Sequence, residues 1–206
     1  MEPKQQPDGT RSSRSNPRRT TSLRADAARN VTQIREAAIA AFHGRGLGTP
    51  LEEIAAVAGV SKATIYNRFG GRQGLIDAVI DELVGTEMQP ILERARQPGD
   101  PWVRLATYST DLRDLQYREP AAVDVLLMDY PDSVRVAAQW NSAADTGIAL
   151  VERAHTAGVL RADFTADDLY QALVANGLLL RHRPKPARRD YDRRIGFFLD
   201  SLHPRP

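Results

Sequence analysis

Residues 49–75 constrain the fold of this chain more than any other segment, because they predict two short helices around a glycine turn. Thr49 is a suitable N-cap for the first helix, and Glu52 completes a capping box. Gly59 stands where a left-handed residue would end that helix, and Ser61 suits the N-cap of the second. The pattern predicts a helix-turn-helix, whose second helix enters the major groove in proteins that use it to bind DNA.

The second helix of this pair, Lys62 to Arg68, carries small, hydroxylated and cationic side chains on its expected outer face. Lys62 and Arg68 can donate to guanine or phosphate, Asn67 can bind adenine or phosphate, and the Tyr66 hydroxyl can donate to phosphate. Arg72 adds a charge at the start of the next helix. The predicted DNA-binding residues are Thr49, Ser61, Lys62, Ala63, Thr64, Tyr66, Asn67, Arg68 and Arg72.

The motif A-G-V-S-x-x-T-x-Y-x-x-F, followed by a basic residue and a leucine, resembles the TetR family of bacterial transcriptional regulators. The motif is formed here by Ala58, Gly59, Val60, Ser61, Thr64, Tyr66, Phe69, Arg72 and Leu75. The resemblance covers residues 24–85, and it implies that Thr64, Tyr66, Arg68 and Arg72 touch DNA. Ala63 stands where the family frequently has glycine, and Arg68 where it frequently has histidine. Both departures lie on the surface expected to read the operator sequence.

The rest of the chain predicts an all-α protein of about nine helices, because apolar residues recur at helical spacing and no alternating strand pattern occurs. Residues 1–22 are basic and poor in apolar side chains, so we expect a disordered N-terminal arm. We expect a helix-turn-helix domain over residues 23–85, with its first helix at Asp26–His43, and an effector-binding and dimerisation domain over residues 86–206. Pro90 is expected to kink or divide the helix that starts near Arg72.

A short reading helix contacts few base pairs, so useful specificity implies a homodimer on two half-sites of a palindromic operator. The last two long helices carry apolar stripes suited to a dimer surface. The residues of these stripes are Leu169, Leu173, Gly177, Leu178, Leu180, Ile195, Phe198, Leu199 and Leu202. The resemblance implies that the two helices form a four-helix bundle between subunits; packing within one subunit is the alternative.

Three further helices, predicted over residues 102–117, 120–129 and 133–157, exceed what a dimer surface needs. The resemblance implies a pocket among them that receives an unidentified small-molecule effector. Asn141 draws attention because a buried amide needs hydrogen-bond partners. The candidate lining residues are Met88, Tyr108, Leu112, Met128, Trp140, Asn141, Ala144 and Ile148, and for each of them ordinary core packing is the alternative.

Composition excludes several other classes of protein. The chain has no cysteine, and its four histidines lack metal-ligand spacing, so we predict no catalytic residues, no metal site, no cofactor and no enzymatic activity. No apolar run approaches the ~18 residues of a membrane span, so we expect no membrane partner and a cytoplasmic location. The prediction is a regulator, most simply a repressor released by an effector. A constitutive repressor, an architectural DNA-binding protein and an activator stay open, with an all-helical enzyme a remote alternative.

Overall fold

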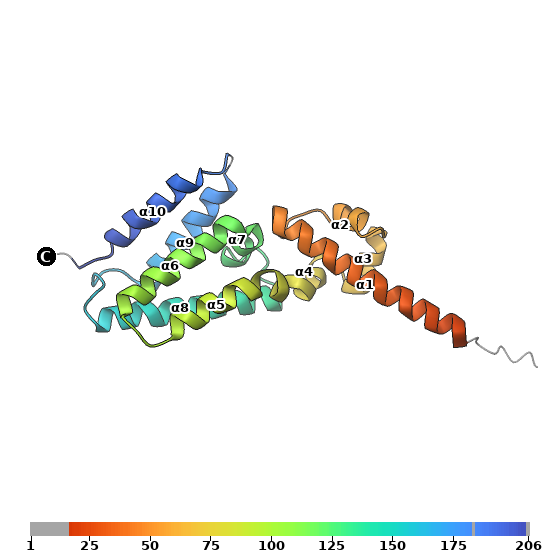
Figure 1. Cartoon of the computed structure of the whole chain (residues 1–206), viewed down its shortest axis with the longest axis horizontal. Coiled ribbons are helices and arrows are strands. Elements are labelled where there is room, and N and C mark those ends of the chain that lie inside the picture. The colour runs from red at the N-terminus through yellow and green to blue at the C-terminus, as the bar shows by residue number, and fades with distance from the viewer. Residues whose placement is uncertain (1–16, 183, 205–206) are drawn as a thin grey trace, which may run out of the picture.

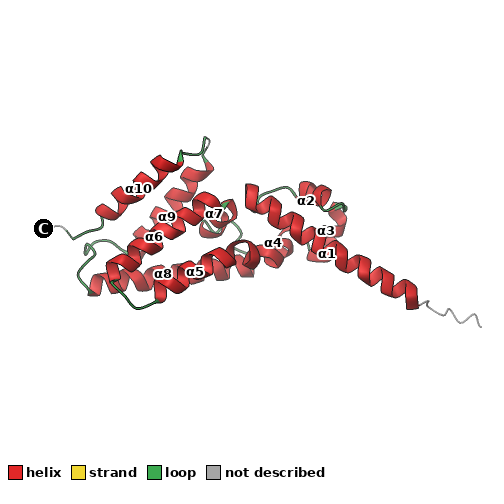
Figure 2. Ribbon diagram, in the orientation of Figure 1, coloured by secondary structure: helices red, strands yellow, loops and turns green. Residues whose placement is uncertain are grey.

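The computed structural model describes residues 17–182 and 184–204, with side chains from Ala28 onward. Within these residues every regular element is a helix and no strand occurs, which confirms the all-α prediction (Figure 2). The elements are α1 (Pro17–Arg45), α2 (Leu51–Val57), α3 (Lys62–Phe69), α4 (Arg72–Ile80), the π-helical turn η1 (Asp81–Gly85), α5 (Thr86–Arg96), α6 (Pro101–Arg118), α7 (Pro120–Leu126), α8 (Val134–Thr156), α9 (Ala166–Arg181) and α10 (Arg188–Asp200).

The helices form two lobes joined through α4 and η1 (Figure 1). In the first lobe α1 packs on α2 and α4, and α3 packs on both α2 and α4. Ile34, Phe42, Ile54, Ile65 and Leu75 are fully buried there, so helices of seven to nine residues are held by one shared apolar core. Such short helices are marginal alone, and this packing supplies most of their stability.

Helix α1 begins at Pro17, well before the predicted start at Asp26. Residues 17–22 are therefore helical, and our prediction of a disordered arm is wrong for them. Pro17 does not disrupt this helix, because proline is accepted in the first turn, where its missing N–H would have no partner within the helix. The remainder of the predicted arm, residues 1–16, lies outside the described residues.

The predicted irregularity in the long connecting helix lies upstream of Pro90. Helix α5 continues through Pro90, whereas the backbone widens into a π-helical turn at Asp81–Gly85. Such turns are rare and occur mostly as single insertions in α-helices. When α4, η1 and α5 are counted as one continuous helix, the described residues form the nine helices that the sequence predicted.

In the second lobe α6 packs against α5, α8 and α9, and α7 fills the space between α8, α9 and the end of α1. Helix α10 lies across α6 and α9 at the edge of this lobe (Figure 1). Within α10 only Tyr191 is fully covered, although Leu202 just beyond its end is also buried. The last helix is thus the most loosely attached element of the second lobe.

Candidate DNA-binding surface and ligand cavity

The turn between α2 and α3 has the geometry predicted from the sequence. Gly59 adopts a left-handed conformation with φ 66°, which reverses the chain after α2 at no steric cost. The Val60 amide donates to the Ala55 carbonyl at 3.0 Å. Ser61 caps α3, because its hydroxyl oxygen accepts the Thr64 backbone N–H at 3.1 Å. The capping role predicted for Ser61 is confirmed.

Helix α3 turns one apolar face inward and a polar face outward. Ile65 is fully buried and Phe69 is half-buried, whereas Lys62, Ala63, Tyr66, Asn67 and Arg68 are exposed and Thr64 is half-buried. Half of the Tyr66 surface is accessible to solvent. The outward side chains predicted for DNA contact therefore lie together on one exposed face, and their contact with DNA stays a prediction.

The two cations of this face differ in their partners, because Lys62 is paired with a carboxylate and Arg68, within the described residues, is not. The Lys62 ammonium lies 2.5 Å from a Glu52 carboxylate oxygen on α2, and this hydrogen bond raises the pKa of Lys62 and lowers the pKa of Glu52. Arg68 and Asn67 form no hydrogen bond or ion pair with the side chains that the structure describes. The guanidinium of Arg68 is consequently free to meet an anion outside the protein.

Two of the predicted DNA-binding residues serve the protein's own backbone. Thr49 is buried and donates its hydroxyl to the Gly46 carbonyl at 2.9 Å. It does not cap α2, whose first residue follows Pro50 without any side-chain cap. Arg72 donates to the carbonyls of Leu47 and Thr49, both at 2.7 Å. These interactions supply hydrogen-bond donors to carbonyl groups of the turn between α1 and α2.

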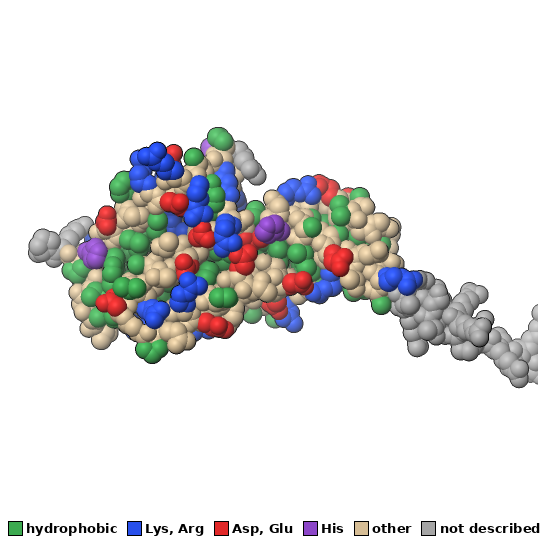
Figure 3. Space-filling model, in the orientation of Figure 1, with side chains coloured by type: hydrophobic (Ala, Val, Ile, Leu, Met, Phe, Trp, Pro, Cys, Tyr) green, Lys and Arg blue, Asp and Glu red, His purple; other side chains and the backbone are tan. Residues whose placement is uncertain are grey.

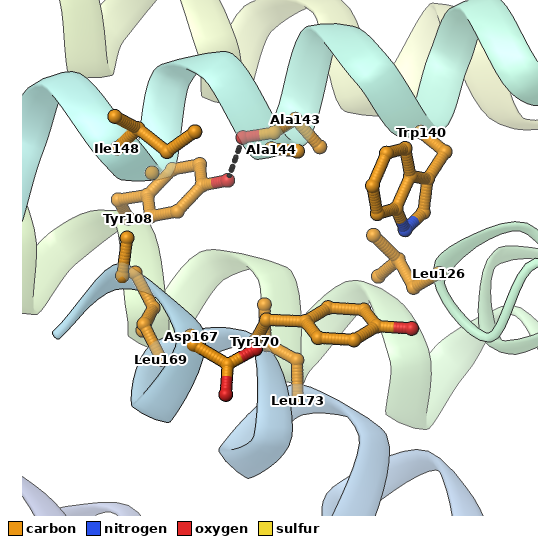
Figure 4. A pocket seen from close by; sticks show the side chains of 12 residues that line it. Tyr108, Leu126, Trp140, Ala143, Ala144, Ile148, Asp167, Leu169, Tyr170 and Leu173 are labelled. Carbon is orange, nitrogen blue, oxygen red and sulfur yellow. Dashed lines mark hydrogen bonds between the residues drawn. The ribbon is translucent and has the colours of Figure 1, made fainter.

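An apolar cavity of about 330 Å³ lies between α6, α7, α8 and α9. Figure 4 shows side chains of α8 and α9 facing one another across it, and the rings of Trp140 and Tyr170 meet edge to face at 5.9 Å. The Tyr108 hydroxyl donates to the Ala143 carbonyl at 2.6 Å, and burial raises the pKa of Tyr108. The lining residues are Tyr108, Leu126, Trp140, Ala143, Ala144, Gly147, Ile148, Ala166, Asp167, Leu169, Tyr170 and Leu173.

Half of the predicted ligand-binding residues line this cavity, namely Tyr108, Trp140, Ala144 and Ile148. The others do not. Met88 and Leu112 are fully buried core residues. Asn141 is exposed, because it follows Trp140 by one residue and so points roughly 100° away around the helix. Met128 adopts a left-handed φ of 54° just after α7, where it ends the helix in place of the usual glycine.

The residues of α9 that line the cavity were missed because their apolar stripe was assigned to a dimer surface. Leu169 and Leu173 face the cavity, and Leu180 and Leu202 are buried within the chain. A Cβ atom at Gly177 would lie 3.2 Å from Val123, so this glycine permits close packing within the subunit. Leu169, Leu173, Gly177, Leu180 and Leu202 are thus packed within the single chain, which favours the alternative of packing within one subunit, and their dimer role stays a prediction.

Other residues of the same two helices remain accessible. Leu178 is 55% exposed, and Ile195, Phe198 and Leu199 are half-buried. Phe197, which the sequence analysis did not select, is 65% exposed. The outward apolar surface of α9 and α10 is therefore centred on Leu178 and Phe197.

Buried carboxylates at the start of α7 and within it connect the two lobes. The Leu47 backbone N–H donates to Asp124 at 2.5 Å, and Arg181 at the end of α9 pairs with Asp124 and Asp129. Glu119 is fully buried, where it hydrogen-bonds His43 at the end of α1. Burial raises the pKa of both carboxyl groups. No local sequence pattern indicates this junction, because its partners lie far apart along the chain.

Two further findings concern the described residues alone. They contain no group of three or more His, Cys, Asp or Glu side chains arranged to hold a metal ion. Among the same residues, no helix combines the length and the hydrophobicity needed to span a bilayer.

A helix, a left-handed glycine and a second helix with an exposed polar face define this chain as a helix-turn-helix protein. Residues 34–79 match the model of the bacterial regulatory proteins of the tetR family. The HTH-type transcriptional regulatory protein RaaS of Mycobacterium tuberculosis is 40% identical over 74 residues, which are 36% of this chain and 34% of that protein. Residues 34–79 therefore carry the helix-turn-helix of the tetR family of bacterial regulatory proteins.

The match to this curated relative spans about a third of its length, and solved structures extend the likeness of the fold. The structure of AibR in complex with isovaleryl coenzyme A and operator DNA has a TM-score of 0.63 at 20% identity, over 85% of this chain and 98% of that one. FadR from Bacillus subtilis in complex with stearoyl-CoA has a TM-score of 0.59 at 15% identity, over 84% and 97%. Both likenesses show the fold, over 85% and 84% of this chain.

Proposed function

We propose that this protein is a transcriptional repressor that binds a palindromic operator as a homodimer and leaves it when a small apolar effector occupies the cavity. Residues 23–85 form the DNA-binding domain in this proposal, and residues 86–206 form the effector-binding and dimerisation domain. The observation that carries the proposal is the exposed polar face of α3 with the unpaired Arg68 guanidinium.

DNA recognition follows from that face. An arginine can form two hydrogen bonds with the O6 and N7 atoms of guanine, and the neighbouring Asn67 can bind adenine or phosphate. Helix α3 has eight residues, so it reads only a few base pairs. A second copy supplies the second half-site, about 34–36 Å away along one face of the DNA.

The dimer surface in this proposal is formed by the outward apolar side chains of α9 and α10. Leu178 and Phe197 are each more than half exposed in the single chain, and an exposed apolar patch on neighbouring helices can mark a contact with a partner. An isologous interface brings the same residues together from both subunits.

The effector class follows from the cavity wall. Alanine, leucine, isoleucine and aromatic side chains dominate it, so it favours an apolar or aromatic group. AibR and FadR, which share the fold, are bound to acyl-coenzyme A molecules, and an acyl chain has the apolar character that this wall would accept.

Helix α7 can couple effector binding to DNA binding, because it contacts both the cavity and the first lobe. Leu126 lines the cavity, while Asp124 on the same helix holds the Leu47 amide at the end of α1. An effector that shifts α7 would therefore alter the contact between the two lobes and the spacing of the two α3 helices. A 100-fold loss of operator affinity needs about 2.7 kcal/mol of difference in effector affinity between the two conformations.

The test begins with selection of bound sequences from a random DNA duplex pool, followed by affinity measurements at several salt concentrations. We expect an inverted repeat. Arg68→Ala should weaken binding by about 2–6 kcal/mol, because it removes one base contact from each half-site. Arg94→Ala, a solvent-exposed cation in the second lobe, is the matched control and should leave the affinity unchanged. Failure to enrich any sequence would refute specific DNA recognition.

Effector control is tested separately with the selected operator. Small apolar molecules that raise the melting temperature of the protein should also release it from this DNA. Stabilising molecules that leave operator affinity unchanged would instead favour a repressor without an effector.

A further inference from the structure

A second cavity, of about 280 Å³, lies between α6, α9 and α10. Leu169 and Leu173 separate it from the first cavity, since they line both. Its wall differs from that of the first cavity because it combines apolar groups with two arginines, a serine and an asparagine. The lining residues are Ser109, Arg113, Leu169, Ala172, Leu173, Ala175, Asn176, Leu179, Arg194 and Phe198.

Asn176 contributes a buried acceptor that has no partner. Only 3% of this residue is exposed, and its amide nitrogen donates to Gln116 Oε1 and to the Tyr191 hydroxyl, both at 2.6 Å. Gln116 in turn donates its own amide to the Leu173 carbonyl, so its oxygen must face a donor, and this fixes the orientation of the Asn176 amide. The Oδ1 atom of Asn176 is left without a hydrogen bond in the structure.

The two arginines contribute positive charge without a carboxylate partner. Arg113 is half-buried, and its Nε atom is buried without a hydrogen-bond partner. Burial lowers the pKa of Arg113 and the charge of Arg194 also lowers it, whereas Tyr191 and Asp192 act in the opposite direction. Neither guanidinium forms an ion pair within the described chain. Figure 3 shows basic side chains gathered over α10, on the helix that supplies Arg194.

We propose that this second cavity binds a small hydroxycarboxylate, a ligand class distinct from the apolar effector of the first cavity. The carboxylate accepts hydrogen bonds from the guanidinium groups of Arg113 and Arg194, which offer the planar donor geometry that carboxylates favour. The hydroxyl donates to Asn176 Oδ1. The apolar body of the ligand lies against the leucine side chains and Phe198.

A ligand in this cavity would stabilise the packing of α10 against the rest of the second lobe. Ser109 and Arg113 belong to α6, Asn176 belongs to α9, and Arg194 and Phe198 belong to α10, so one ligand contacts all three helices. Helix α10 buries only Tyr191 along its length without such a ligand. A ligand that binds only the folded arrangement stabilises it by mass action.

The experiment uses calorimetric titration of the full chain with three six-carbon probes. 2-Hydroxyhexanoate carries both the carboxylate and the hydroxyl, hexanoate lacks the hydroxyl, and 1,2-hexanediol lacks the carboxylate. We expect 2-hydroxyhexanoate to bind at least tenfold more tightly than either other probe, because hexanoate leaves Asn176 Oδ1 unpaired and 1,2-hexanediol leaves the two guanidinium groups without an anion.

Paired variants locate the ligand. Arg194→Gln should weaken 2-hydroxyhexanoate binding about tenfold through loss of a charge-assisted hydrogen bond. Arg193→Gln is the matched control, since this neighbouring arginine does not line the cavity and pairs with Asp190 instead. Equal melting temperatures of the two variants without ligand would show that both are folded.

Three outcomes would overturn the proposal. They are the absence of binding at millimolar concentrations, equal affinity for the three probes, and loss of binding in Trp140→Ala but not in Arg194→Gln, which would place the ligand in the first cavity. Operator affinity is measured independently with the selected DNA. Failure of this proposal therefore leaves the proposed repressor function intact, and failure of operator binding leaves this one testable.

Discussion

The DNA-binding face of α3 and the helices around the cavities use their side chains in opposite ways. Helix α3 buries Ile65 and presents polar groups to solvent with few partners. Helix α8 buries seven of its 23 residues, and its neighbours α6 and α9 close around apolar space. Helix α3 therefore exposes charged and polar groups to solvent, whereas the helices of the second lobe enclose apolar cavities.

This difference predicts different consequences of substitution. A change on the outer face of α3 removes a contact with DNA and leaves the core intact. Operator affinity should therefore fall without a change in the stability of the fold. A change beside the cavities alters packing as well as any ligand contact, so stability and ligand response are coupled. The junction at α7 is where the two regions meet, and it combines buried charge with contacts to both lobes.

The largest expected effect comes from the outward side of α9. Leu178→Glu places a charge on the proposed dimer surface, so we expect monomers and a loss of operator affinity of about 1,000-fold (about 4 kcal/mol) or more, because half of the base contacts are lost. Val134→Glu is the matched control at another exposed apolar position. Sedimentation and gel-shift measurements test both variants, and a dimeric Leu178→Glu protein would contradict this surface.

The next effect concerns the junction. Asp124→Ala leaves the buried Leu47 amide without its acceptor and Arg181 without one carboxylate, so we expect a loss of about 3 kcal/mol of stability and a melting temperature lower by roughly 6–12 °C. Asp192→Ala removes an exposed partner of Arg188 on α10 and should cost at most about 0.5 kcal/mol. Thermal unfolding of the two variants distinguishes a structural junction from a superficial ion pair.

A smaller effect tests the inward region alone. Ala144→Phe fills the first cavity, so we expect the affinity for the anionic dye 1-anilinonaphthalene-8-sulfonate, whose aromatic rings favour apolar cavities, to fall about tenfold. Ala149→Phe, on the exposed side of α8, should leave the dye affinity unchanged. If dye binding survives in the filled variant, the cavity is not the binding site.

The smallest effect is a pH dependence of stability. Burial raises the pKa of Glu119 above its ordinary value of 4.5, so the folded chain retains this proton to higher pH than the unfolded chain. The stabilising contribution of the protonated group is present below pH 4.5 and is lost as pH rises through the higher folded pKa. Glu119→Gln should therefore lose less stability than the wild type as the pH rises from 4.5 to 8, which urea titrations at each pH measure. Parallel curves would contradict this role of Glu119.

Local patterns predicted the helix-turn-helix well. Gly59 and Ser61 act through partners within a few residues, so their spacing alone indicates the turn and the cap. The same pattern failed for Thr49, which does not cap α2 and instead donates its hydroxyl to the Gly46 carbonyl. Nothing in the spacing distinguishes a hydroxyl that caps a helix from one that folds back on a distant turn.

Around the cavities, helical periodicity identified apolar faces without identifying what each face meets. Trp140, Ala144 and Ile148 were correctly placed on the cavity wall, whereas Leu169 and Leu173 on the opposite wall were assigned to a dimer. Asn141 was misplaced by one position in the helical phase. A leucine stripe has the same spacing whether it covers a cavity, a core or a second subunit.

The sequence by itself determined the all-α fold, the position of the helix-turn-helix and the outward face of α3, because caps, glycine turns and helical spacing act over a few residues. Tertiary structure alone decided the pairing of Asp124 with Leu47, the orphaned oxygen of Asn176 and the separation of the two cavities. These features join residues tens of positions apart. Their energies depend on burial and on the direction of each side chain, which are fixed only when the helices pack.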